Sequence, residues 1–372
     1  MQIGIPRETL PGETRVAATP ETVKKYIAAG HTVVIERGAG TPAYFPDDDY
    51  VQAGAQLVDQ AQALGAALVL KVRSPSAEER QLMKSGTVLV GMLDPFNAEG
   101  LADMAAAGLT AFALEAAPRI TRAQSLDVLS SQANLAGYKA VLLAANQYGR
   151  LIPMMMTAAG TLKAARVVVL GVGVAGLQAI ATAKRLGAVV EASDVRPAAK
   201  EQVLSLGAKF IDVPFETDEE REIAEGTGGY ARAMPAAWMA RQAALVAERC
   251  KQADIVISTA LIPGRPAPEL ISAETVHGMK PGSVIVDLAV ERGGNCPLSE
   301  LDKIVDINGV ALIGLSNLPA LVPHDASALY ARNILDFSKL IFDAEGQLAI
   351  QKEDEIVAAC LVCQDGNVLR SA

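Results

Sequence analysis

A glycine-rich turn between an apolar segment and a helix-like segment constrains the fold most strongly. The apolar segment Arg166–Leu170 is typical of a buried strand, and the G-x-G-x-x-G turn Gly171–Gly176 follows it directly. In such a turn Gly171 permits the sharp bend, Gly173 lets the backbone approach a pyrophosphate, and Gly176 lets the next helix pack close to the strand. The unit predicts a Rossmann domain that binds a dinucleotide.

The helix after this turn is expected at Val174–Leu186. Its first N–H groups, including those of Val174 and Ala175, and the positive end of its dipole would face the phosphates. A lone G-x-G-x-x-G motif is weak evidence, so two alternatives stay open. The turn can connect strand and helix without binding anything, or it can belong to an FAD or other nucleotide site.

An acidic residue at the end of the next predicted strand indicates which dinucleotide is bound. Ala188–Ala192 is apolar and leads to Asp194, eighteen residues past the last motif glycine, with Val195 beside it. An acid there accepts hydrogen bonds from the adenosine ribose and repels a 2′-phosphate, which favours NAD(H) over NADP(H). Arg196, two residues on, is a cation that would attract a 2′-phosphate and counts against this choice.

Two later segments follow predicted strands, where open α/β sheets bind ligands. Ser258–Gly264, with Ala260 and Leu261, is expected on the adenine side of the cofactor. Val286–Ala289, with Asp287, is expected towards the nicotinamide together with Gly293–Asn295. Both segments also fit plain strand-to-helix connections.

The strand and helix pattern predicts an α/β protein with two Rossmann-like domains, because 372 residues are enough for two or three domains. Parallel sheets are expected in both, the second being a doubly wound NAD-binding domain. The predicted domains are 1–134 plus 320–372, which makes the first discontinuous, and 135–319. Strands are expected at Ile3–Pro6, Thr32–Glu36, Ala67–Val72, Thr87–Gly91, Thr110–Leu114, Arg166–Leu170, Val189–Ala192, Lys209–Asp212, Ile255–Thr259, Ser283–Leu288 and Val310–Gly314.

Three further segments carry specific expectations. Glu115–Gln132 is rich in polar residues and precedes a long helix expected at Asn134–Tyr148. Asp218–Gly229 is acidic and glycine-ended, so it is either a solvated loop or a mobile flap whose tip, Tyr230, closes over a ligand. The C-terminal part is expected to form a long helix at Ala326–Phe342 and then a strand pair, with one strand at Ile356–Val362, that packs on the first domain.

Charge and composition exclude several classes of function. The 33 basic residues are outnumbered by 42 acidic ones, so nucleic-acid binding is not expected. The most apolar stretch, Ala164–Ala183, contains Arg166, Gln178 and three glycines, which argues against a membrane span. Cys360 and Cys363 have redox or zinc spacing but no second pair or nearby histidine, so buried reduced thiols and no metal are expected.

Several motifs resemble a known superfamily. Gly4–Glu8 together with Glu13–Ala17 resembles the opening of alanine dehydrogenases and transhydrogenases. Pro118–Asp127, Met154–Gly160 and Leu261–Pro268 are similar to the NAD(H)-binding alpha component of proton-translocating NAD(P) transhydrogenases. The resemblance covers essentially the whole chain.

The resemblance implies a function within a complex. It implies a homodimer that lies on the cytoplasmic side of the inner membrane and is held there by membrane-embedded partner subunits. Hydride would pass between NAD(H) on this chain and NADP(H) on a partner (Si-specific/Re-specific), coupled to proton translocation. No membrane helix is expected in this sequence, so it resembles the split form of the alpha component, in which separate subunits carry the membrane helices.

The resemblance also assigns roles to residues. Arg119, Gln124, Asp127 and Ser130 match the polar loop at the dihydronicotinamide, and Tyr230 matches the tyrosine of a mobile loop. Asp127 and Arg119 would pair and fix the loop, while Gln124, a donor and an acceptor, would reach the second nucleotide. Without the resemblance, these residues could simply cap the helix that begins near Ser130.

Two other functions remain as alternatives. An alanine dehydrogenase needs a carboxylate clamp and a proton-transfer group. By resemblance Arg15 and Lys71 match the clamp and Asp287 the catalytic acid, but Gly91–Phe96 lacks the histidine that this enzyme uses there. A non-catalytic NAD-sensing module would use the same cofactor motifs, with the polar loop as an interface.

Overall fold

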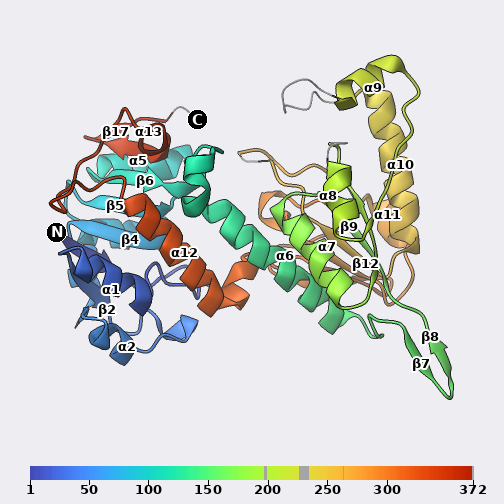
Figure 1. Cartoon of the computed structure of the whole chain (residues 1–372), viewed down its shortest axis with the longest axis horizontal. Helices are drawn as coiled ribbons and strands as arrows, with labels where there is room; N and C mark the ends of the chain where they lie inside the picture. Colours follow the sequence, from blue (N-terminus) through green and yellow to red (C-terminus); the bar gives the residue numbers. More distant parts are fainter. Residues whose placement is uncertain (197–198, 226–233, 263, 371–372) are drawn as a thin grey trace. The chain divides into compact units, whose positions relative to one another are not determined.

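The computed structural model describes residues 1–196, 199–225, 234–262 and 264–370. These form two compact units, unit 1 (Met1–Gln132 with Pro319–Ala372) and unit 2 (Ala133–Leu318). Each is an α/β unit with a largely parallel sheet, which confirms the predicted fold class (Figure 1). Helix α6 (Val128–Gln147) crosses the division, so the boundary lies inside a helix rather than in a loop.

The sheet of unit 1 has the strand order β17-β16-β6-β5-β4-β1-β2-β3. The strands from β6 to β3 are parallel, whereas β16 runs antiparallel to β6 and extends the sheet with the end of the chain (Figure 1). The strands are β1 (Gln2–Ile5), β2 (Thr32–Glu36), β3 (Gln56–Val58), β4 (Leu68–Arg73), β5 (Val88–Met92), β6 (Thr110–Ala113), β16 (Leu361–Gln364) and β17 (Asn367–Val368).

The central strands β4, β5 and β6 of unit 1 are buried because helices cover both faces of the sheet. Side chains alternate along a strand, so Leu68 and Leu70 of β4 lie in one core with Phe337, whereas Val69 lies in a second core with Leu101. The helices of unit 1 are α1 (Pro20–Ala28), α2 (Asp47–Gln52), α3 (Gln60–Leu64), α4 (Ala77–Leu82), α5 (Ala98–Ala106), α12 (Pro323–Ser338) and α13 (Glu355–Cys360).

The main sheet of unit 2 has the strand order β11-β10-β9-β12-β13-β15-β14, and its strands are parallel except β14. From β11 to β15 this is the doubly wound order, in which the first strand, β9, lies in the middle of the sheet. The chain continues from β9 to β10 and β11 on one side and from β12 to β13 and β15 on the other. The strands are β9 (Arg166–Leu170), β10 (Val189–Ser193), β11 (Lys209–Phe210), β12 (Ile255–Ser258), β13 (Val284–Asp287), β14 (Ile304–Ile307) and β15 (Val310–Ile313).

Helices also cover both faces of this sheet. Val167 and Val169 of β9 share a core with Ile180, and Val168 shares another with Val246. A separate hairpin of β7 (Met155–Thr157) and β8 (Gly160–Leu162) extends away from the rest of unit 2 (Figure 1). The remaining helices are α7 (Val174–Arg185), α8 (Ala199–Ser205), α9 (Asp218–Glu225), α10 (Ala236–Gln252) and α11 (Ala273–His277).

Three sequence expectations are wrong in detail. The helix expected from Asn134 begins six residues earlier as α6, because Asp127 caps it. The strand expected at Ile356–Val362 is helix α13 followed by β16, since Asp354 accepts N–H groups at the start of the helix. The acidic segment expected as a loop forms α9 up to Glu225.

Candidate dinucleotide-binding site and polar loop

The glycine turn of unit 2 has the geometry that the motif predicts. Gly171 has a φ of 91°, a conformation that favours glycine, and a Cβ there would lie 2.7 Å from the Thr259 hydroxyl oxygen. A Cβ on Gly176 would lie 1.9 Å from the Gly171 carbonyl oxygen, so α7 can approach the turn only without one. The Thr259 hydroxyl donates to that same carbonyl (3.0 Å) and joins the ends of β9 and β12.

Gly173 leaves space where a ligand can approach. It is exposed, and a Cβ built on it would meet no atom within 4 Å. Val174 and Ala175 follow as the first residues of α7, and the first N–H groups of a helix have no acceptor inside the helix. An open approach to these N–H groups and to the positive helix end fits a pyrophosphate.

Asp194 lies directly against this turn. It follows β10 and is buried, and its Oδ2 accepts the Val172 N–H at 2.7 Å. Gln242 of α10 donates to the Asp194 carbonyl oxygen at 3.0 Å and fixes the backbone from the other side. Sequence reasoning missed Gln242, because a glutamine in a helix far along the chain carries no motif signal.

Arg196 pairs with Asp194. Its Nε donates to Oδ1 and its Nη2 to Oδ2, both at 2.9 Å. Burial would raise the pKa of Asp194, but the hydrogen bonds from Arg196 and from the Val172 N–H outweigh it and hold the pKa below its ordinary value. Asp194 is therefore a carboxylate at neutral pH, while Val195 between the two is exposed.

Asn295 holds the segment after β12 in place. It is fully buried, its Oδ1 accepts the Ala260 N–H (3.1 Å), and its Nδ2 donates to the carbonyl oxygens of Ala260 and Pro268 (2.8 Å each). Leu261 follows and is exposed. A buried asparagine that satisfies both backbone groups of one residue fixes that residue's position, a role that no sequence motif indicated.

Asp287 lies at the end of β13 and accepts hydrogen bonds from the loop that follows it. It is fully buried, and its two carboxylate oxygens accept the N–H groups of Ala289, Asn295 and Cys296 and the hydroxyl of Ser299. These donors use the lone pairs that a carboxylate has. Asp287 thus binds the loop after β13 and, through Asn295, supports Ala260.

The polar loop of unit 1 ends in a helix cap. Asp127 precedes α6, its Oδ1 accepts the Ser130 N–H at 2.9 Å, and its Oδ2 accepts the Ser130 hydroxyl. Asp127 and Ser130 therefore cap the start of α6. Arg119 is exposed and forms no ion pair with Asp127, although both residues lie in the described part of the chain.

The rest of the loop is held in place by α12, while side chains such as that of Gln124 are exposed. Thr121–Leu126 forms a 3-10 helix in which Gln124 is exposed. Asn333 of α12 donates to the Ser125 carbonyl oxygen (2.7 Å) and accepts from the Ser131 hydroxyl (2.7 Å). Tyr230, the expected tip of the flap, lies outside the described residues.

Glu115, at the start of this loop, is a half-buried acid that the sequence did not single out. Its two oxygens accept the N–H groups of Leu93 (3.0 Å) and Asp94 (2.9 Å). Burial raises the pKa of Glu115 to about 7, despite these hydrogen bonds. The acid therefore connects the turn after β5 to the polar loop and titrates near neutral pH.

The residues that resemble a carboxylate clamp are engaged in internal ion pairs. Arg15 donates through Nε and Nη2 to Glu13 (2.7 and 2.6 Å) and through Nη1 to Gln132 (2.8 Å). Lys71 lies 2.9 Å from Glu79 and 3.3 Å from Glu8, and all the side chains of these pairs are buried. Desolvation opposes the charge on Glu13, but Arg15 outweighs it and lowers the pKa of Glu13 to about 2.

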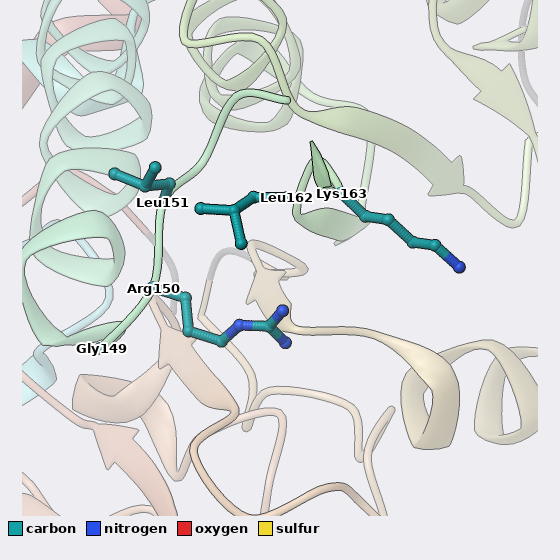
Figure 2. A pocket seen from close by; sticks show the side chains of 5 residues that line it. All are labelled: Gly149, Arg150, Leu151, Leu162 and Lys163. Atoms are coloured by element: carbon teal, nitrogen blue, oxygen red, sulfur yellow. The ribbon is translucent and has the colours of Figure 1, made fainter. Parts of the chain in front are cut away.

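A pocket of about 300 Å³ lies at the base of the β7–β8 hairpin, away from the glycine turn in sequence. It is lined by Gly149, Arg150, Leu151, Leu162 and Lys163. In Figure 2 the Leu162 side chain points across the pocket towards Leu151, and the Lys163 ammonium points away from it. This mixture of leucine and cation does not resemble the predicted nucleotide site.

The cysteines have a structural environment. Cys360 and Cys363 are buried in unit 1, and burial raises their pKa values to about 12 and about 11. Within the described ranges, no three side chains of the metal-binding types come together. The helices of those ranges include none with both the length and the apolar character needed to cross a bilayer.

Comparison with known proteins places the chain in a family. Residues 4–136 match the family model described as alanine dehydrogenase/PNT, N-terminal domain, and residues 140–371 match its C-terminal domain. The chain is 51% identical to a protein from Rhodospirillum rubrum that is named as the first part of NAD(P) transhydrogenase subunit alpha. That match extends over 381 residues, which cover 100% of this chain and 98% of the relative.

Solved structures agree with the sequence match. The transhydrogenase from Sinorhizobium meliloti superposes with a TM-score of 0.90 at 51% identity and covers 99% of this chain and 100% of its own. An L-alanine dehydrogenase superposes with a TM-score of 0.82 at 29% identity, covering 99% and 96%. The chain therefore belongs to the alanine dehydrogenase/PNT family and, within it, is similar over its whole length to the NAD(P) transhydrogenase alpha subunits.

Proposed function

We propose that the chain is the NAD(H)-binding component of a proton-translocating transhydrogenase, in which hydride passes directly between NAD(H) here and NADP(H) on a partner subunit. The observation that carries the proposal is the hydrogen bond from the Val172 N–H to the Asp194 carboxylate, which joins the phosphate turn to a ribose-binding acid. The full-length similarity to a protein named as a portion of subunit alpha supports a role within a complex.

In this proposal the nucleotide binds to unit 2. The glycine turn and the first N–H groups of α7 bind the pyrophosphate, and Asp194 binds the adenosine ribose. When bound, NADH supplies the hydride. Transfer between two nicotinamides needs orientation and exclusion of water rather than an acid or a base, which suits the exposed side chains of Arg119 and Gln124 on a fixed loop. Si-specific/Re-specific transfer is part of the proposal.

We also propose that the chain is a homodimer held at the cytoplasmic face of the inner membrane by its partner subunits. The β7–β8 hairpin supports a self-association surface, because Met154 and Met156 are 61% and 74% exposed there beside an exposed Leu162. Contiguous exposed apolar side chains typically mark an interaction site. Changing both methionines to lysine should convert dimer to monomer in sedimentation velocity, and an unchanged dimer would move the interface elsewhere.

The family's other activity, alanine dehydrogenation, has less support. A substrate carboxylate would have to displace Glu13 from Arg15, or Glu8 and Glu79 from Lys71, inside a buried cluster. The turn Gly91–Phe96 also contains no histidine for proton transfer. A non-catalytic NAD sensor would share the nucleotide contacts and differ only in lacking exchange.

Reconstitution tests the proposal. The full chain is mixed with an NADP(H)-binding transhydrogenase component, and reduction of thio-NADP⁺ by NADH is followed by absorbance. Exchange should require both proteins. Binding of NADH without exchange in the mixture would favour the sensor, and no binding of NADH would reject the proposal.

A further inference from the structure

Four hydrogen bonds reach the carboxylate of Asp194. Two come from the backbone: the Val172 N–H to Oδ2 (2.7 Å) and the Arg196 N–H to Oδ1 (2.8 Å). The other two come from the Arg196 guanidinium, Nε to Oδ1 and Nη2 to Oδ2, both at 2.9 Å. A carboxylate offers about four lone-pair positions, so all of them are taken.

The two kinds of donor differ in how firmly the protein holds them. The backbone donors belong to the glycine turn and to the chain after β10, which Gln242 fixes through the Asp194 carbonyl. The Arg196 side chain is 51% exposed, and its Nη2 also donates to the Val172 carbonyl oxygen at 3.2 Å. Ribose hydroxyls can therefore gain acceptor positions on Asp194 only where the guanidinium now lies.

We infer that Arg196 is a second specificity-determining residue. Its guanidinium occupies the positions on the Asp194 carboxylate to which ribose hydroxyls would donate. It could also bind a 2′-phosphate, but its ion pair with Asp194 prevents this. The inference rests on the proposed function, because it concerns the same nucleotide site. If so, the pair of Asp194 and Arg196 together excludes NADP(H). Asp194 repels a 2′-phosphate, and by pairing with Arg196 it also keeps this cation from binding the phosphate.

The chemistry of the pair supports this assignment. A guanidinium forms two parallel hydrogen bonds to a carboxylate or to a phosphate. The Arg196 guanidinium that now binds the Asp194 carboxylate therefore also has the geometry to bind a 2′-phosphate. The low pKa of Asp194 keeps it ionised at neutral pH, and an ionised partner holds Arg196 most strongly. Neutralising Asp194 should release Arg196 without removing it from the site.

Asp194→Asn is the change that makes this release. The asparagine carbonyl oxygen can still accept the Val172 N–H, so the turn keeps its support, while the ion pair with Arg196 is lost. NADH and NADPH are titrated into the full-length chain by nucleotide fluorescence. The variants are Asp194→Asn, Arg196→Gln, the double variant Asp194→Asn/Arg196→Gln and a control, Asp194→Asn/Lys200→Gln.

Asp194→Asn should bind NADPH at least about tenfold more tightly than the wild type, which corresponds to about 1.4 kcal/mol. The double variant with Arg196→Gln should lose this gain. The Lys200→Gln control should keep it, because Lys200 is a nearby cation in the sequence that pairs with Asp212 instead. Arg196→Gln by itself should bind NADH as tightly as the wild type or more tightly, since the ribose no longer displaces a guanidinium.

Three results would overturn the inference. If the double variant Asp194→Asn/Arg196→Gln kept the gain in NADPH affinity, the loss of repulsion between Asp194 and the 2′-phosphate would explain the whole effect. If Asp194→Asn showed no gain in NADPH affinity, Arg196 would not be a phosphate ligand. A loss of NADH affinity in Arg196→Gln would contradict its competition with ribose. If the wild type bound no NADH, the proposed function itself would fail; thermal unfolding of each variant shows that it is folded.

Discussion

Asp127 and Ser130 form a closed pair at the start of α6, in which one carboxylate oxygen accepts the Ser130 N–H at 2.9 Å and the other accepts its hydroxyl. Both oxygens are thus used within the protein. The pair gives the polar loop a fixed end, because the cap determines where the loop stops and the helix begins. Asp127 therefore has a structural role that must be separated from its proposed role in hydride transfer.

Asp127→Ala and Asp127→Asn separate these roles. Loss of the cap in the alanine variant should lower the free energy of unfolding by about 0.5–2 kcal/mol, whereas asparagine is an equally good capping residue and should change it little. Urea unfolding measures both. If Asp127→Asn also exchanges hydride at the wild-type rate in the reconstituted mixture, Asp127 acts as a cap and not in transfer.

Gly173→Ala should weaken nucleotide binding, whereas Gly176→Ala should lower stability. A Cβ at Gly173 meets no atom within 4 Å, so this variant should fold normally but bind NADH at least about tenfold more weakly, because the methyl group takes the space of the pyrophosphate. A Cβ at Gly176 would lie 1.9 Å from the Gly171 carbonyl oxygen, so that variant should be destabilised by several kcal/mol. Fluorescence titration and thermal unfolding distinguish them. Wild-type NADH affinity in Gly173→Ala would place the pyrophosphate elsewhere.

Glu115 should make stability depend on pH. Its pKa is about 7 in the folded chain against an ordinary value of 4.5, so the folded state binds the proton more tightly. The resulting stabilisation is complete below about pH 4.5 and is lost as the pH rises through about 7, with an upper size of about 3 kcal/mol. Glu115→Gln cannot ionise and should show a flatter curve in this window. Parallel unfolding curves for both proteins between about pH 5 and 7.5 would contradict the assignment.

The buried Arg15–Glu13 pair predicts an absence of amino-acid dehydrogenase activity. Because both edges of the guanidinium are bonded to Glu13 and Gln132, the wild type should not oxidise NADH when supplied with pyruvate and ammonia. The same preparation must bind NADH in a fluorescence titration, which excludes inactive protein. A rate comparable to that of hydride exchange would instead support the alanine dehydrogenase alternative.

Gln124→Asn tests the proposed contact with the second nucleotide. Gln124 is exposed on a 3-10 helix that Asn333 fixes, so shortening it by one methylene should leave the fold and NADH affinity nearly unchanged. Exchange should slow by about tenfold or more if its amide reaches across to a partner's nucleotide. A collapse of NADH affinity would assign Gln124 to the local pocket instead.

Much of the fold could be predicted because its signals are local. The apolar segment Arg166–Leu170, the glycines after it and Asp194 are close in sequence, and each has a backbone or charge requirement that one residue type meets. The regular helices and parallel strands follow from the same local patterns. The strand predicted at Ile356–Val362 was wrong because a short apolar run fits a strand or a buried helix equally well, and the cap at Asp354 decides between them.

The sequence by itself determined the α/β class, the phosphate turn and the acid beside it, because those depend on spacing along one stretch of chain. Only the tertiary structure decided what the polar and charged side chains do. Asp287 holds a loop through Asn295, Arg15 is neutralised by Glu13, and Arg196 fills the lone pairs of Asp194. These roles depend on burial and on which partners packing brings within hydrogen-bond distance, and neither quantity is encoded in residue spacing.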